Sequence, residues 1–206
     1  MENKKNQLTK RALLSTCWKI NQFILQLSVN KNRKLLTKDR NIIERIIFRN
    51  IYTNPDIKKI LFVGCHLYSS WYHKIFNLSG KEFHTIDPDP ESKKYGSPQM
   101  HITGKFELLK NQPKMFKNYD CVILNGVFGY GINSLADKIS ALEAAHKILK
   151  ENAIMLIGFR NQSVPDIDLD IIDEIWFDAH FVPGFDSNFV ETGHSNGHSF
   201  VCFKNK

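Results

Sequence analysis

The sequence predicts an α/β fold in which helices cover a doubly wound, mostly parallel β-sheet, with a helical extension at the N-terminus. Two observations predict it. From about residue 59 onward, short apolar runs alternate with segments of helical length, and the runs are apolar on both faces. Such runs are typical of strands buried in a parallel sheet. Before residue 55, apolar residues instead recur at helical spacing.

The N-terminal extension, residues 1–55, has the pattern of two amphipathic helices. Apolar residues at steps of three and four predict the first helix over residues 8–29. A second isoleucine-rich pattern runs from Ile42 to Tyr52 and ends where Asn54 precedes Pro55, a pair that disfavours continued helix. We expect residues 56–206 to form one α/β domain behind this extension.

The α/β domain is predicted from its apolar runs and the segments that connect them. The expected strands are Ile60–Val63, Phe83–Ile86, Cys121–Leu124, Ile154–Ile157 and a final strand over Ser199–Phe203. The expected crossovers are Ser69–Asn77, Phe106–Lys110 and Leu135–Leu149. This alternation indicates an open sheet with connections over both faces.

Composition excludes several classes of protein. The 206 residues are 42% hydrophobic and 24% charged, which is typical of a globular domain and excludes a disordered chain. The four cysteines lie far apart, so neither a disulfide framework nor a cysteine-rich zinc site is indicated. The apolar stretch 12–29 is interrupted by Lys19 and three amides, unlike a bilayer span or a secretory signal. We expect a cytoplasmic protein.

The positive charge is concentrated in the N-terminal part of the chain. The whole sequence has a net charge of +7, whereas residues 1–59 contain 14 Lys and Arg against 4 Asp and Glu. Such an arm suits contact with nucleic acid or an anionic membrane surface. A solvated helical face in a lysine-rich sequence is the simpler explanation. Both interpretations stay open.

Ligands of an open parallel sheet bind beyond the carboxyl ends of its strands, so the residues after each strand carry the chemistry. After the first strand, Gly64 lets the backbone approach a ligand closely, and a helix starts directly behind it. After the second strand, Asp87 stands 23 residues beyond Gly64, where a carboxylate can accept both hydroxyls of an adenosine ribose. Asp87 before Pro88 is also ordinary turn chemistry.

A third group of residues follows the strand Cys121–Leu124. Asn125, Gly126 and Val127 open a glycine-rich loop and are candidates for the wall of a cofactor or substrate site. Phe128 and Tyr130 in this loop either stack on a ligand ring or anchor the loop on the core.

These three turns, in this order and spacing, resemble the class I S-adenosylmethionine-dependent methyltransferases over residues 58–160. Residues 141–153 are similar to that family's helix, turn and fifth strand, with Glu151-Asn152-Ala153 where Pro-Gly-Gly is usual. Residues 68–76, 86–96 and 125–131, with His198, resemble a group of bacterial methyltransferase-like proteins. The resemblance implies a Rossmann-like sheet of seven strands and S-adenosylmethionine as cofactor. The cofactor-binding residues that it implies are Gly64, Cys65, His66, Tyr68, Asp87, Pro88, Asn125, Gly126 and Val127.

The sequence departs from the family pattern at two places. Of the three alternating glycines usual after the first strand, only Gly64 is present, with His66 and Tyr68 in the other positions. The acidic residue that usually contacts adenine should fall at residues 103–105, and none of them is acidic. The Pro-Pro-aromatic motif of enzymes that methylate base amino groups is also absent after Asn125.

If the cofactor binds, its sulfonium already activates the methyl group, so few residues need be catalytic. His66 and His101 are the main candidates for a base, and the others are His73, Asp89, His194 and His198. His194 and His198 also have a spacing seen in metal sites, with Asp186 or Glu191 as further ligands, but the Ser-Asn-Gly segment between them indicates a loop. We predict no metal.

The leading hypothesis is therefore a methyltransferase acting on a small-molecule or glycan-type acceptor. The first alternative is a catalytically degenerate methyltransferase fold that serves as a binding or scaffold protein. The second is an RNA-directed methyltransferase that uses the basic arm for phosphate contacts. A dinucleotide-dependent oxidoreductase is less consistent, because the first turn lacks Gly-x-Gly-x-x-Gly. The sequence leaves the acceptor and the oligomeric state undetermined.

Overall fold

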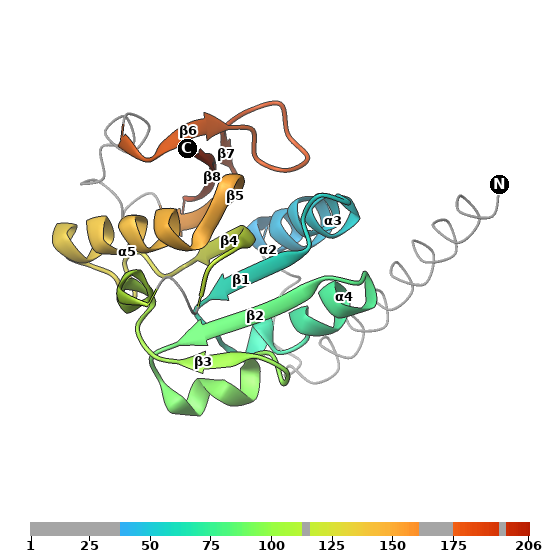
Figure 1. Cartoon of the computed structure of the whole chain (residues 1–206). Helices are drawn as coiled ribbons and strands as arrows, with labels where there is room; N and C mark the ends of the chain where they lie inside the picture. The colour runs from blue at the N-terminus through green and yellow to red at the C-terminus, as the bar shows by residue number, and fades with distance from the viewer. Residues whose placement is uncertain (1–37, 113–115, 161–174, 194–196) are drawn as a thin grey trace.

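The computed structural model describes residues 38–112, 116–160, 175–193 and 197–206 (Figure 1). The helix expected over residues 8–29 lies outside these ranges.

The centre of the molecule is the mostly parallel sheet that the apolar runs predict. Its strands are β1 (Lys59–Val63), β2 (Glu82–Asp87), β3 (His101–Thr103), β4 (Tyr119–Asn125), β5 (Leu149–Arg160), β6 (Phe177–His180), β7 (Phe189–Glu191) and β8 (His198–Asn205). Seven of them follow the order β3-β2-β1-β4-β5-β8-β6, and the short β7 pairs with β8 as an eighth. Strands β1–β5 run parallel, and β8 is antiparallel to β5.

The order of the strands fixes where a ligand site can form. The chain starts in the middle of the sheet, moves outward through β2 and β3, and then returns to the other side of β1 as β4. The order therefore reverses between β1 and β4. We refer to the region beyond the carboxyl ends of these two strands as the crevice, because open α/β sheets bind their ligands there.

The helices are short apart from the last. They are α2 (Lys38–Ile42), the π-helical η1 (Ile43–Ile47), α3 (Phe48–Thr53), α4 (Tyr72–Leu78) and α5 (Leu135–Ile148). Short 3₁₀ segments are η2 (Leu67–Ser69), η3 (Pro90–Tyr95) and η4 (Phe106–Asn111). Helical structure from α2 to α3 ends at Asn54, whose backbone is extended (ψ 119°), as the following proline predicts.

Two apolar cores lie on opposite faces of the sheet. One joins α5 and η4 to the sheet through residues such as Leu142 and Leu109. The other joins η1, α3 and α4 to the opposite face, with Phe48, Phe62 and Phe76 at its centre. Figure 1 shows α5 on one side of the sheet and α3 and α4 on the other. The second half of the N-terminal extension thus shares a core with the α/β domain, and a boundary at residues 55/56 stays a prediction.

One residue near the start of β5 has an unusual backbone conformation. Asn152 has φ +64°, in the left-handed region. Asparagine tolerates this region better than other residues with a side chain, which explains how it replaces the usual glycine. Within the described ranges, we find no helix with the length and apolar character needed to cross a membrane.

Candidate functional site

The turn after β1 requires its glycine. Gly64 has φ +85°, and its N–H donates to the carbonyl of Ile86 in β2 at 2.9 Å. A Cβ at this position would lie 3.0 Å from Cγ1 of Val127 in the loop after β4. Gly64 therefore allows both the left-handed turn and the close approach of the two loops that border the crevice.

Asp87, the last residue of β2, is held beside this turn. One carboxylate oxygen accepts the backbone N–H of Cys65 at 2.7 Å, and the other accepts the N–H of Asp89 at 2.9 Å. The residue is only 9% exposed, while the neighbouring Pro88 is exposed. Each carboxylate oxygen can accept a second hydrogen bond, so Asp87 is oriented by the protein and retains capacity for a ligand.

The Cys65 thiol is not a nucleophile in this environment. Burial, together with the nearby Asp87 carboxylate, raises the pKa of Cys65 to about 12. Because thiolates are the reactive form, this side chain is neutral and inert at neutral pH. The contribution of Cys65 to the turn is its backbone N–H.

The two side chains that replace the usual glycines pack against residues outside the turn. His66 is exposed, and its ring stacks on Tyr68 at 5.6 Å between centroids and on Tyr95, at the end of η3, at 6.0 Å. Tyr68 also contacts the Arg40 guanidinium of α2, which lies 3.1 Å from the ring centroid. The stacked rings of His66 and Tyr68 therefore line the turn, with Tyr95 against His66 and Arg40 against Tyr68.

Arg40 is a residue that the sequence reasoning missed. Its Nη1 donates to the Tyr72 hydroxyl at 2.9 Å, and this hydroxyl donates to Glu44 Oε1 at 2.8 Å. Tyr72 is fully buried in the core beneath the turn. The Arg40 side chain thus ties α2 both to Tyr68 in the turn and to Tyr72 at the start of α4. Only the basic character of the extension signalled this, without singling out the residue.

Asn125 ends β4 on the other side of the crevice. It is 7% exposed, and its Oδ1 has no hydrogen-bond partner among the described residues. Its neighbour in β5 is Gly158, where a Cβ would lie only 2.2 Å from that oxygen. Trp71 Nε1, at the start of α4, is one of several other buried polar atoms for which the described chain offers no partner. Unsatisfied buried atoms are uncommon in native proteins and call for a specific reason, such as a ligand.

The two aromatic residues of the glycine-rich loop after β4 have different roles. Gly126 has φ +72°, and the carbonyl of Val127 accepts the N–H groups of Tyr130 and Ile132 at 3.2 and 3.0 Å. Phe128 is buried and bridges to Ile132, so it anchors the loop. Tyr130 is 60% exposed, with the Arg160 guanidinium 5.2 Å from its ring centroid. Of the two aromatic residues, Tyr130 is accessible to a ligand.

The two main candidate bases occupy different environments. His66 is exposed in the first turn. The His101 Nδ1 lies 3.0 Å from Thr85 Oγ1, and its Nε2 is buried without a partner in the described structure. Burial lowers the pKa of His101 against the opposing effect of Asp87, so its imidazole is neutral at neutral pH.

The remaining candidates are dispersed. His73 lies in α4, and the Asp89 side chain caps η3 by accepting the N–H of Glu91 at 2.9 Å. His198 begins β8 opposite Arg160. His194 falls outside the described residues, so its pairing with His198 is untested. In the ranges that the structure covers, no three metal-ligating side chains cluster.

Comparisons by sequence and by structure give different results. No family model and no curated protein matches the sequence. In contrast, the fold matches the N-methyltransferase NodS from Bradyrhizobium japonicum WM9 in complex with S-adenosyl-L-homocysteine, with a TM-score of 0.62 at 14% identity over 87% of this chain and 90% of that one. A TehB-like S-adenosylmethionine-dependent methyltransferase from Corynebacterium glutamicum matches with a TM-score of 0.58 at 16% identity, over 95% and 100% of the two chains.

A third match is an S-adenosylmethionine-dependent methyltransferase from Archaeoglobus fulgidus, with a TM-score of 0.53 at 13% identity over 81% of this chain and 92% of that one. These chains are matched over nine-tenths or more of their length, so the likeness extends over the whole fold. Together with the strand order, they confirm the fold that the three turns predicted. The chain has the fold of the class I S-adenosylmethionine-dependent methyltransferases.

Proposed function

We propose that this protein is an S-adenosylmethionine-dependent methyltransferase acting on a small-molecule or glycan-type acceptor. The observation that carries the proposal is the Asp87 carboxylate, which the Cys65 and Asp89 N–H groups orient beside the turn after β1. In a fold shared with methyltransferases, this is the position at which a carboxylate accepts the hydroxyls of a ribose.

The residues of the crevice fit an adenosyl cofactor. Gly64 keeps the turn free of a Cβ where the loop after β4 approaches, and Asp87 retains acceptor capacity on both oxygens. The proposed cofactor-binding set is the one implied by the family resemblance: Gly64, Cys65, His66, Tyr68, Asp87, Pro88, Asn125, Gly126 and Val127. His66 and Tyr68 fit this set because stacking on Tyr95 and Arg40 fixes their rings as a wall of the turn.

When bound, S-adenosylmethionine supplies a methyl group already activated by the sulfonium charge. The protein's own contribution is then alignment and exclusion of water. Asp87 orients the sugar, and the loop from Asn125 to Ile132 borders the acceptor side. His66 is our proposed base for an acceptor that must lose a proton, because it is exposed at the turn, whereas His101 is paired with Thr85.

Ligand-dependent thermal denaturation tests this proposal. S-adenosylhomocysteine at about one hundred times its dissociation constant should stabilise the native state by about 2.7 kcal/mol. For a chain of this size, that raises the melting temperature by roughly 5–10 °C. In the Asp87→Asn variant the charge is lost and one acceptor becomes a donor, so the shift should shrink to near zero at the same ligand concentration.

The matched control is Asp178→Asn, an exposed acid of β6 at the other end of the sheet. It should retain the full shift. The melting temperature of each variant without ligand separates a loss of binding from a loss of stability. A protein that shows no shift with S-adenosylhomocysteine or S-adenosylmethionine would be the degenerate scaffold instead, and an unchanged shift in Asp87→Asn would refute the ribose assignment.

A further inference from the structure

On the side of the crevice where we place the methyl acceptor, two polar residues lie on a single face of the sheet. Asn125 of β4 pairs in register with Gly158 of β5, so the two lie on the same face. Arg160 follows Gly158 by two residues and lies on that face as well, about 6.6 Å further along the strand. Both strands end at the carboxyl edge, where the crevice opens. A ligand of modest size spans the distance between Asn125 and Arg160.

At the inner end of this set is a hydrogen-bond acceptor that the described protein leaves unused. The Asn125 Oδ1 is buried and has no described partner. Space for the amide depends on the absence of a side chain at residue 158, since a Cβ there would lie 2.2 Å from Oδ1 and 2.7 Å from the Phe200 ring. Leaving a buried acceptor unsatisfied destabilises the protein. A donor group on a ligand would recover this cost.

At the outer end is an exposed cation beside an exposed ring. The Arg160 guanidinium lies 5.2 Å from the Tyr130 ring centroid, and no carboxylate of the described chain forms an ion pair with it. The ring comes from the loop after β4, and the cation from the end of β5. Arginine presents a planar fork of donors that suits carboxylate and phosphate groups, and stacking on a ring orients that fork.

We propose that Arg160 and Tyr130 recognise an anionic group, a carboxylate or a phosphate, on a small acceptor molecule whose opposite end donates a hydrogen bond to Asn125 Oδ1. The identification of this molecule as the methyl acceptor rests on the function proposed above. The anion subsite itself depends only on the side chains of β5 and of the loop after β4. With this subsite, the proposed methyl acceptor is an anionic small molecule and not any small molecule.

Binding of three ring probes tests the subsite directly. Benzoate and phenyl phosphate carry the two anionic groups, and benzamide is the neutral counterpart of benzoate. Calorimetric titration is carried out with and without saturating S-adenosylhomocysteine. We expect both anions, or one of them, to bind about tenfold or more tightly than benzamide, as a charge-assisted contact requires. Selectivity for only one anion would identify the group.

Variants assign this selectivity to a residue. Arg160→Gln should abolish the preference for the anion, and Arg160→Lys should retain part of it, because the charge remains and the fork is lost. The matched control is Arg49→Gln, which removes the same charge from an exposed position on α3 and should leave the preference intact. Equal losses in Arg160→Gln and Arg49→Gln would overturn the proposal, because they would reflect only the overall charge.

The two proposals fail in distinguishable ways. If S-adenosylhomocysteine binds but the anions have no advantage over benzamide, or no probe binds, the anion subsite is wrong and the cofactor assignment stands. If the anions bind through Arg160 but S-adenosylhomocysteine does not bind, the subsite stands and the methyltransferase proposal fails.

Discussion

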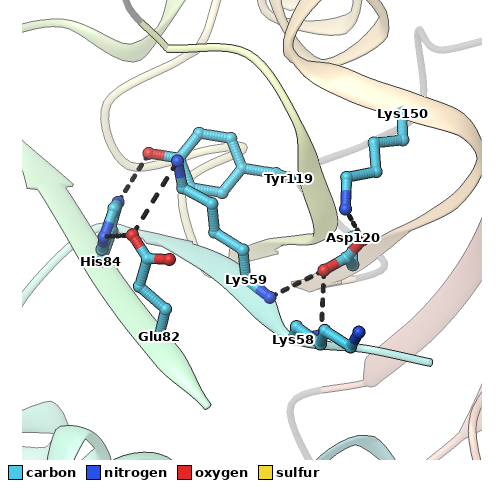
Figure 2. A network of polar contacts seen from close by, with 7 residues as sticks. All are labelled: Lys58, Lys59, Glu82, His84, Tyr119, Asp120 and Lys150. Atoms are coloured by element: carbon cyan, nitrogen blue, oxygen red, sulfur yellow. Dashed lines mark hydrogen bonds and ion pairs between the residues drawn. The ribbon is translucent and has the colours of Figure 1, made fainter. Parts of the chain in front are cut away.

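The two ends of the parallel strands, the amino edge and the carboxyl edge of the sheet, differ in how the hydrogen bonds of their polar side chains are satisfied. At the amino edge, charged and polar residues of β1, β2 and β4 bond to one another and to the backbone (Figure 2). At the carboxyl edge, β2 ends in Asp87, which keeps acceptor capacity, and β4 ends in Asn125, whose Oδ1 has no described partner. The first arrangement holds strands in register, whereas the second leaves hydrogen-bonding capacity for a ligand.

One part of the amino-edge network is centred on Asp120. Its Oδ2 accepts the N–H groups of Lys58 and Lys59 at 2.9 and 2.8 Å, and its Oδ1 accepts Lys150 Nζ at 2.6 Å. The residue thus joins the start of β4 to the start of β1 and to β5. A side chain with this many protein partners has a structural role.

The other part is centred on His84. Its Nδ1 lies 2.9 Å from the Tyr119 hydroxyl, and its Nε2 lies 2.8 Å from Glu82 Oε1. Lys59 Nζ is 3.9 Å from the same Glu82 oxygen, over the Tyr119 ring. Burial lowers the pKa of His84, so the neutral ring accepts from Tyr119 and donates to Glu82. This group links β1, β2 and β4 at the edge opposite the crevice.

The largest expected effect on stability is that of Asp120→Ala. The substitution leaves two backbone N–H groups without their acceptor, each costing about 1–3 kcal/mol where it is buried. Because the edge is partly open to water, we expect a total loss of about 2–4 kcal/mol in the free energy of unfolding, measured by urea denaturation. A loss below about 0.5 kcal/mol, similar to that of a typical surface substitution, would contradict the structural role.

The pH dependence of the free energy of unfolding gives a second test of the role of Asp120. Burial raises the pKa of Asp120, but the Lys150 ammonium and the two backbone donors outweigh it and hold that pKa below its ordinary value of 3.8. A carboxylate with a depressed pKa stabilises the native state above its unfolded pKa and loses this effect as the pH falls through the folded value. The difference in stability between wild type and Asp120→Asn should therefore be constant above about pH 5 and shrink below pH 4. A difference that grows on acidification would have the wrong sign.

Much of the sheet could be predicted from the sequence because its strands are buried on both faces. The runs Ile60–Val63 and Cys121–Leu124 have no polar residue, and each lies within a strand of the structure. Strands β6 and β7 were missed because they lack this burial. In β6 only Phe177 is buried, and in β7 only Val190, so neither strand has a repeated apolar pattern.

The candidate site was predictable only in part. Gly64, Asp87 and Asn125 follow strands directly, and the rule that ligands bind at strand ends identifies them. The same rule applied to β5 points to Arg160, the last residue of that strand, which the sequence reasoning did not use. The pairing of His84 with Tyr119 bridges 35 residues and depends on strand register, so no local pattern indicates it.

A smaller effect is expected of Tyr119→Phe. The change removes the hydroxyl from His84 and keeps the buried ring, so the free energy of unfolding should fall by about 1 kcal/mol, the net contribution of one hydrogen bond. Urea denaturation measures the loss, and titration with S-adenosylhomocysteine provides the functional readout. Because Tyr119 lies at the edge away from the crevice, ligand affinity should be unchanged. A clear loss of affinity would show that the two edges are coupled.

The smallest expected effect on stability, at the carboxyl edge, is that of Asn125→Leu. The substitution keeps the side-chain volume and removes an acceptor that has no described partner, so stability should stay within about 0.5 kcal/mol of wild type or increase. The variant should bind more weakly any substrate molecule that donates a hydrogen bond to this position in the wild type. Thermal denaturation without ligand measures the first quantity. A large loss of stability would mean that Asn125 serves the fold, as Asp120 does.

The central claim is that the crevice between β1 and β4 binds an adenosyl cofactor through Asp87. A crystal structure of the complex with S-adenosylhomocysteine tests it most directly. We predict both ribose hydroxyls within hydrogen-bond distance of the Asp87 carboxylate, with the His66 and Tyr68 rings still stacked beside the turn. Electron density for these two rings inside the crevice, with the ligand absent or bound elsewhere, would contradict the account.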